Sequence, residues 1–178
     1  MKIVKVQIVF ILFFTLIPAM LYSQNFAEKF IDRFSYHFDQ SSNKLVDLAK
    51  AMPEDTYTWA PDEETMTVAQ VFMHISRHNY TLPSIGLDID IPEDVDAGAL
   101  EKITDKDIVI KELKKSIDHV SRSIEKLSSD DLEKQTELFG ETVESWAVLM
   151  LLITHMSEHV GQAISYARMN GIAPPWSR

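Results

Sequence analysis

Four stretches of the chain repeat apolar residues at intervals of three and four, the spacing that places them on one face of an α-helix. They run over about 26–50, from a cap at Thr65 or Thr67 to about 82, over about 105–127 and over about 142–170. No segment alternates apolar and polar residues long enough to suggest a strand. The pattern predicts an all-α protein, a four-helix bundle.

The third and fourth stretches differ in how much of their surface is apolar. The third carries one narrow stripe, made of Ile110, Leu113, Ile117, Val120, Ile124 and Leu127. The fourth is apolar around most of its circumference in its first half, so we expect it to be largely buried. His119 lies off the stripe of the third stretch, and we expect it to be exposed.

A long connection, from Pro83 to about Thr104, separates the second and third helices and contains Gly86, Pro92 and Gly98. It is longer than the usual loop of a helical bundle. Its length predicts either a crossover between helices that are not simple hairpin neighbours, or a lid over a site.

The first residues have the layout of a secretory signal peptide. Two lysines in 1–5 precede an almost wholly apolar run over 6–17, and small or polar residues follow as far as Gln24. The run is short for a membrane span of about 20 residues. We therefore expect residues 1–24 to be removed near Ser23 or Gln24, and residues 25–178 to form an exported domain, periplasmic or extracellular, without a membrane span. An uncleaved anchor is the alternative.

The composition of the chain restricts which partners and which chemistry are possible. The formal net charge is −10, or −12 once Lys2 and Lys5 are removed, which argues against nucleic acid as a partner. The chain has no cysteine, so disulfides, thiolate ligands and cysteine nucleophiles are excluded. Bundles often pair through helix faces, so a homodimer is compatible with the sequence. Nothing in the sequence identifies a small-molecule substrate.

The candidate chemistry lies in three histidines. His155 and His159 are one turn apart, so their imidazoles differ by only about 40° around the fourth helix and can reach one ion. His74 on the second helix is a candidate third ligand. Three neutral imidazoles leave one coordination position open, which is typical of catalytic metal sites.

Motifs across residues 25–178 resemble the DinB family of small helical metalloproteins. They are Met52-Pro53-Glu54, Tyr57, Trp59, Pro61, Met66-Thr67, Gln70, His74-Ile75, the His-x-x-x-His-x-Gly-Gln segment from His155 and the Gly-x-x-Pro-Pro segment from Gly171. The resemblance implies a divalent metal on His74, His155 and His159, with zinc or nickel favoured and iron or manganese as alternatives. It also implies a thiol S-transferase or a related hydrolase. An exported metal-binding protein without catalysis is the alternative.

Three further residues, His78, Gln162 and His37, are candidates for positions around this site, and Glu158 is a fourth. His78, one turn from His74, is a fourth ligand, a residue that orients a ligand, or a half-buried polar residue. Gln162 is expected either to hydrogen-bond a group at the metal or to pack between helices. His37 is expected in the core or in a pocket wall.

Glu158 completes the pattern His-x-x-Glu-His of inverted zinc proteases, in which the glutamate is the general base. Such a protease needs a carboxylate ligand further along the chain, and no Asp or Glu follows His159. The peptidase interpretation is therefore disfavoured, and Glu158 is kept as a candidate proton acceptor.

Overall fold

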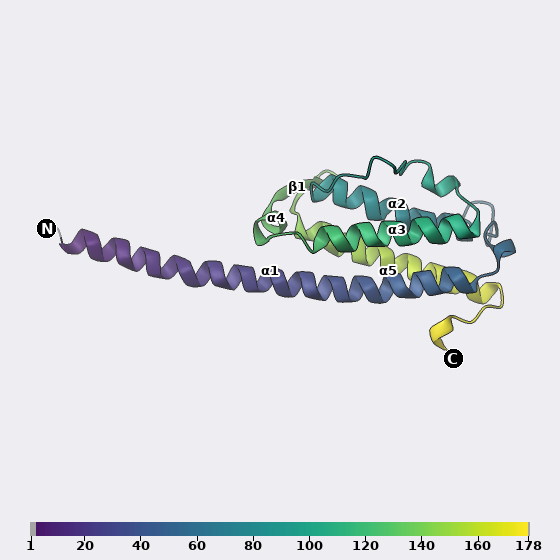
Figure 1. Cartoon of the computed structure of the whole chain (residues 1–178), viewed down its shortest axis with the longest axis horizontal. Coiled ribbons are helices and arrows are strands. Elements are labelled where there is room, and N and C mark those ends of the chain that lie inside the picture. The colour runs from purple at the N-terminus through teal and green to yellow at the C-terminus, as the bar shows by residue number, and fades with distance from the viewer. Residues whose placement is uncertain (1–2, 178) are drawn as a thin grey trace.

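The computed structural model describes residues 3–177, with side chains from residue 27 onward. Four long helices dominate it: α1 (Ile3–Ala51), α2 (Val68–Gly86), α3 (Lys106–Ile124) and α5 (Trp146–Met169) (Figure 1). The short elements are η1 (Glu54–Thr56), η2 (Leu100–Lys102), α4 (Ser129–Glu133), β1 (Gln135–Leu138), β2 (Glu141–Glu144) and η3 (Pro175–Ser177). The prediction of a mainly helical fold is confirmed.

The helices form a ring in which α2 packs on α3 and α5, and α1 packs on the same two helices. α1 and α5 run parallel, because Phe30 meets Trp146 and Ser42 meets Met156. The end of α2 lies at the start of α5, so these two helices are antiparallel. Lys106 at the start of α3 donates to the backbone oxygens of Lys50 and Met52 at the end of α1.

α2 and α3 are therefore parallel neighbours, and the connection over 87–105 has to return along the bundle before α3 begins. This explains its length as a crossover. Its 3₁₀ turn η2 packs on α2 (Figure 1).

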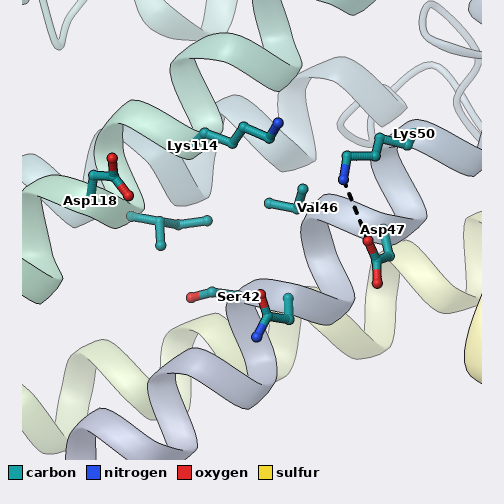
Figure 2. Close-up of a pocket in the computed structure, with 8 residues that line it drawn as sticks. Ser42, Val46, Asp47, Lys50, Lys114 and Asp118 are labelled. Carbon is teal, nitrogen blue, oxygen red and sulfur yellow. Dashed lines mark ion pairs between the residues drawn. The ribbon is translucent and has the colours of Figure 1, made fainter.

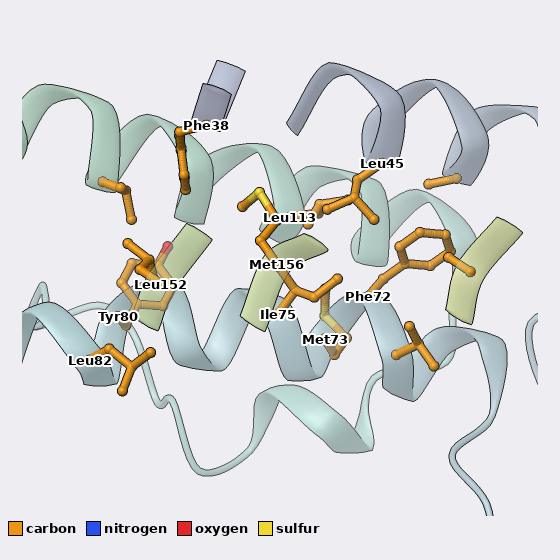
Figure 3. Packing of buried hydrophobic residues seen from close by; sticks show 14 of the residues in the cluster. Phe38, Leu45, Phe72, Met73, Ile75, Tyr80, Leu82, Leu113, Leu152 and Met156 are labelled. Carbon is orange, nitrogen blue, oxygen red and sulfur yellow. The ribbon is translucent and has the colours of Figure 1, made fainter. Parts of the chain in front are cut away.

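The core fills the space between the four helices (Figure 3). Every long helix contributes fully buried apolar side chains, which Figure 3 shows meeting between the ribbons. Among the largest are Phe38 and Leu45 of α1, Phe72 and Ile75 of α2, Leu113 of α3 and Leu149 of α5. The two central helices of the site, α2 and α5, are thus held by packing along their length.

A β-hairpin between α4 and α5 contradicts the prediction that the chain has no strands. β1 and β2 pair antiparallel, with Gln135 opposite Glu144 and Leu138 opposite Glu141. Phe139 and Gly140 turn the chain with φ of 53° and 86°, the positive values of a type I′ hairpin. Each strand has only four residues, too few for a period of two to stand out. α5 consequently begins at Trp146, later than predicted.

α2 also continues past Pro83, where the sequence indicated its end. Proline removes one helical hydrogen bond, but Leu82, Pro83 and Gly86 are all buried, and packing outweighs that loss. The carbonyl of Pro83 accepts from the backbone N–H of Leu87 at 2.9 Å. The last turn of α2 thereby reaches α5.

Gly86 is expected to be intolerant of a larger side chain, because a Cβ there would collide with the side chain of Val148. We expect Gly86→Ala to lower the free energy of unfolding by about 1–3 kcal/mol, the usual cost of overpacking. Urea unfolding followed by circular dichroism measures this.

Gly161→Ala is the matched control for Gly86→Ala. It is also a helical glycine, but no atom lies within 4 Å of its Cβ position. This variant is expected to gain about 0.5–1 kcal/mol from helix propensity. Equal stabilities of the two variants would contradict the close contact between α2 and α5.

The predicted signal peptide, residues 1–24, lies outside the residues whose side chains are described, so it stays a prediction. Within the described part of the chain, no helix combines the length and the apolar character that crossing a membrane requires.

Candidate metal centre

Three partly buried histidines meet where the antiparallel helices α2 and α5 face each other. Thr67 caps α2, and its side chain and that of Gln70 bond each other's backbone N–H. The capped helix carries His74 against α5, where His155 and His159 face it. One ligand atom from each histidine lies within 4.8 Å of the others, and all three residues are partly buried. These three histidines could hold a metal ion.

His74 is oriented by a carboxylate from the crossover. Its Nδ1 lies 2.8 Å from Oε1 of Glu101, and Arg77 donates to the same oxygen at 3.3 Å. Partial burial raises the pKa of Glu101, but the hydrogen bonds from His74 and Arg77 outweigh it and hold that pKa below its usual range. An ionised carboxylate only accepts, so Nδ1 of His74 carries a hydrogen, which leaves Nε2 as the nitrogen that can bind an ion.

His159 is oriented by an amide on its own helix. Its Nδ1 lies 2.7 Å from Oε1 of Gln162, whose Nε2 donates to the hydroxyl of Tyr166 at 3.0 Å. In this orientation of the amide its oxygen faces His159, and because an amide oxygen only accepts, Nδ1 is again the donor and Nε2 is free. Tyr166 meets the ring of Trp59 edge-on at 5.5 Å. Gln162 therefore positions a candidate ligand.

The three rings form a triangle, in which the centroid of His155 lies 4.5 Å from that of His159 and 5.1 Å from that of His74, and the last two are 4.8 Å apart. Within the described part of the chain it has no hydrogen-bond partner. Burial lowers the pKa of His155 to about 3, with further lowering from His78, His159 and His74. Its imidazole is neutral at physiological pH, as a metal ligand must be.

Acidification is expected to destabilise the metal-free protein. An unfolded histidine has a pKa of about 6.5 and His155 in the fold has about 3, so the unfolded chain binds more protons between these values. The contribution of the neutral His155 to the free energy of unfolding is fully present above about pH 6.5, and it decreases as the pH falls toward 3. Because the ring is only partly buried, we expect a loss of about 1–2 kcal/mol between pH 7 and 5. Urea unfolding of chelator-treated protein at both values measures it.

His155→Leu is the control for this pH dependence, because the variant has no imidazole to protonate at that position. Its free energy of unfolding should change less between pH 7 and 5 than that of the wild type. Equal pH dependence of the two proteins would show that protonation of His155 does not oppose folding.

His78 stands next to the three histidines without joining them. Its ring centroid is 4.3 Å from those of both His74 and His155. Its Nδ1 lies 3.0 Å from the backbone oxygen of His74. Burial is the main cause that lowers the pKa of His78. Its nitrogen atoms are outside the set that lies within 4.8 Å.

The other candidates lie elsewhere. Glu158 is exposed and does not belong to the histidine group. His37 is exposed and lines an apolar pocket of about 210 Å³ between α1 and α5, with Phe30 and Met150 among its other residues. The structure thus separates both residues from the cluster.

His119 is a correction to the sequence analysis, which placed it in solvent. Its ring packs on Tyr80 at 5.0 Å, and its Nε2 is buried. The third helix therefore buries a wider face than its aliphatic stripe indicated.

Figure 2 shows a second hollow, a groove of about 360 Å³ between α1 and α3. It is lined by mixed charges, with Lys50 paired to Asp47 at 3.6 Å and with Lys114 and Asp118 across the groove. No histidine lines it, so it is separate from the candidate metal centre.

The donor set fits a divalent metal. Two of the three imidazoles donate from Nδ1 and offer Nε2 to an ion, and the third has no hydrogen-bond partner within the described residues. Glu101, the carboxylate beside His74, is paired with Arg77 at 3.3 Å. Imidazole ligands are neutral when they bind an ion, so they would leave its double charge uncompensated, and a water or thiol in the open position would lose a proton more readily.

Sequence reasoning missed Glu101 and Arg77. Arg77 is one turn from His74, but Glu101 is 27 residues away in a connection without helical periodicity. The sequence offered one indication, the unusual length of this connection, which suggested a lid over a site. Length alone does not identify which residue of the connection contacts the site.

Comparisons with known proteins show which proteins this chain resembles. A sequence model of the DinB family matches residues 23–178. The uncharacterized protein YjoA of Bacillus subtilis (strain 168) is 26% identical over 140 residues, which cover 76% of this chain and 87% of that protein.

Solved structures show the same fold. A DinB-like protein from Bacillus cereus superposes with a TM-score of 0.69 at 18% identity, covering 83% of this chain and 95% of that one. The structure of YjoA gives 0.61 at 22% identity, covering 78% and 92%. A conserved protein from Enterococcus faecalis gives 0.62 at 14%, covering 77% and 94%.

Proposed function

This chain belongs to the DinB family, and from that premise we propose that it is a metal-dependent enzyme of the S-transferase or hydrolase type. One observation carries the proposal: ligand atoms of three imidazoles converge within 4.8 Å. Among the described residues, no other histidine or carboxylate belongs to this group. Three protein ligands leave a position for a substrate or water, as in catalytic sites, whereas structural sites are closed by four.

The roles of the residues follow from their contacts. His74, His155 and His159 would hold a divalent ion, zinc or nickel first, through nitrogens that Glu101 and Gln162 keep free on two of them. The bound ion would supply the Lewis acidity that makes a water or a thiol nucleophilic at neutral pH. Arg77, through Glu101, holds His74 in its orientation.

Titration of metal-free protein with cobalt(II), followed by visible spectroscopy, tests the proposal. We expect one equivalent to bind and the spectrum to change when a small thiol is added, because the thiol enters the open position. Uptake of no cobalt, or a spectrum that a thiol leaves unchanged, would contradict the enzyme proposal.

A metal-binding protein without catalysis is the second candidate, and His78 is the observation that favours it. A fourth imidazole, 4.3 Å from two of the ligand rings, would close the coordination shell if it bound the ion. The visible spectrum of the cobalt form distinguishes the enzyme from the non-catalytic metal-binding protein. If four protein ligands fill the coordination shell, an added thiol cannot bind the ion and the spectrum stays unchanged.

We propose further that the protein is exported. The apolar run over 6–17, with two lysines before it, supports this, and the match to the family begins only at residue 23. The mass of the protein recovered from an exported fraction tests it: loss of about the first 24 residues is expected, and an intact N-terminus in the cell interior would contradict it.

A further inference from the structure

His78 is held in one tautomer by its own helix. Its Nδ1 is 3.0 Å from the backbone oxygen of His74, one turn earlier. A carbonyl oxygen can only accept, so Nδ1 donates and carries the hydrogen of the neutral ring. Nε2 is then left with a lone pair and no hydrogen.

The ring of His78 lies against candidate ligands of both helices. Because Nδ1 is turned to the backbone of α2, Nε2 is on the edge of the ring away from that backbone. The ring lies 4.3 Å from His155 on the facing helix and 4.3 Å from His74, with tilts of 35° and 49°. His78 therefore borders the pair of candidate ligands from α2 and α5.

We propose that Nε2 of His78 is the hydrogen-bond acceptor for the small ligand that occupies the open position of the metal centre. This inference rests on the proposed function. A fixed lone pair attracts a ligand that carries O–H, N–H or S–H and repels one that has only lone pairs. The site therefore selects ligands that keep a hydrogen when bound, such as water, alcohols and amines, over aprotic anions.

His78 acts on the ligand rather than on the ion. Its nitrogens are outside the group whose ligand atoms lie within 4.8 Å of one another, although His74, His155 and His159 all belong to it. In this arrangement His74, His155 and His159 bind the ion, and His78 accepts a hydrogen bond from the small ligand on it.

The test compares two small probes on the cobalt form of the full chain at one fixed pH. Azide has no hydrogen to donate, whereas hydroxylamine carries hydrogens at its donor atom. Their dissociation constants are measured from the visible spectrum of the wild type, of His78→Phe, which keeps a ring without an acceptor, and of His78→Gln, which keeps an acceptor.

We expect all three proteins to take up one equivalent of cobalt. The preference for hydroxylamine over azide should fall about tenfold in His78→Phe, the effect of one hydrogen bond, and should be partly restored in His78→Gln. A preference that changes less than about twofold would overturn the proposal and leave His78 as a packing residue.

The other outcomes also decide the matter. Loss of cobalt from His78→Phe would overturn the proposal in favour of a fourth ligand. Failure of the wild type to bind cobalt would overturn the proposed function, and this inference with it, so the two failures are distinguishable.

Discussion

Replacing His155 with alanine is expected to lower the metal affinity by about 100-fold or more. The ring of His155 faces those of both other candidate ligands and has no hydrogen-bond partner within the described residues. A complete site with four ligands binds zinc with about 10–16 kcal/mol, so one ligand is worth about 3 kcal/mol, or about 100-fold. Competition with a chromogenic chelator measures the affinity.

The matched control for His155→Ala is His37→Ala, which removes the same side chain from an exposed position on another face of the bundle. Its metal affinity should equal that of the wild type. Circular dichroism should show both variants folded, because the core contributes many larger side chains. An unchanged affinity in folded His155→Ala would exclude this residue as a ligand.

Glu101→Ala is expected to weaken metal binding by about 10–100-fold, the usual effect of removing a group that orients a metal ligand. The carboxylate holds Nδ1–H of His74 at 2.8 Å, and its charge makes the imidazole a better donor toward the ion. Glu101→Gln keeps an oxygen that can accept from Nδ1 but loses the charge. We expect its affinity to lie between those of Glu101→Ala and the wild type, measured with the same chelator.

Glu93→Ala controls for the loss of one negative charge from the crossover. Glu93 is exposed in the same connection, so this change should leave the affinity within about twofold of the wild type, since exposed charges contribute little. If Glu101→Ala and Glu93→Ala had equal effects, the contribution of Glu101 would be general electrostatics and not the orientation of His74.

The helices and the histidine pair were accessible from the sequence because both depend on local spacing. Residues four apart on a helix share a face whatever the rest of the chain does, so His155 and His159 could be paired before the fold was known. His74 needed the family resemblance as well, since its place opposite α5 depends on how the helices pack.

The parts that sequence reasoning missed depend on contacts between distant segments. Glu101 reaches His74 only because the crossover returns along α2. Pro83 stays helical because its turn is buried, and the hairpin strands are too short to show alternation. For Glu101 and Pro83, contacts between distant segments outweigh the local propensity of the chain.

The most direct test of the central claim is a crystal structure of the zinc- or cobalt-loaded protein with an anomalous-difference map. We expect one strong peak between α2 and α5, about 2.0–2.1 Å from one nitrogen each of His74, His155 and His159. A loaded protein without a peak there, or with its ion bound by other residues such as the carboxylates of the groove between α1 and α3, would contradict the assignment of this centre.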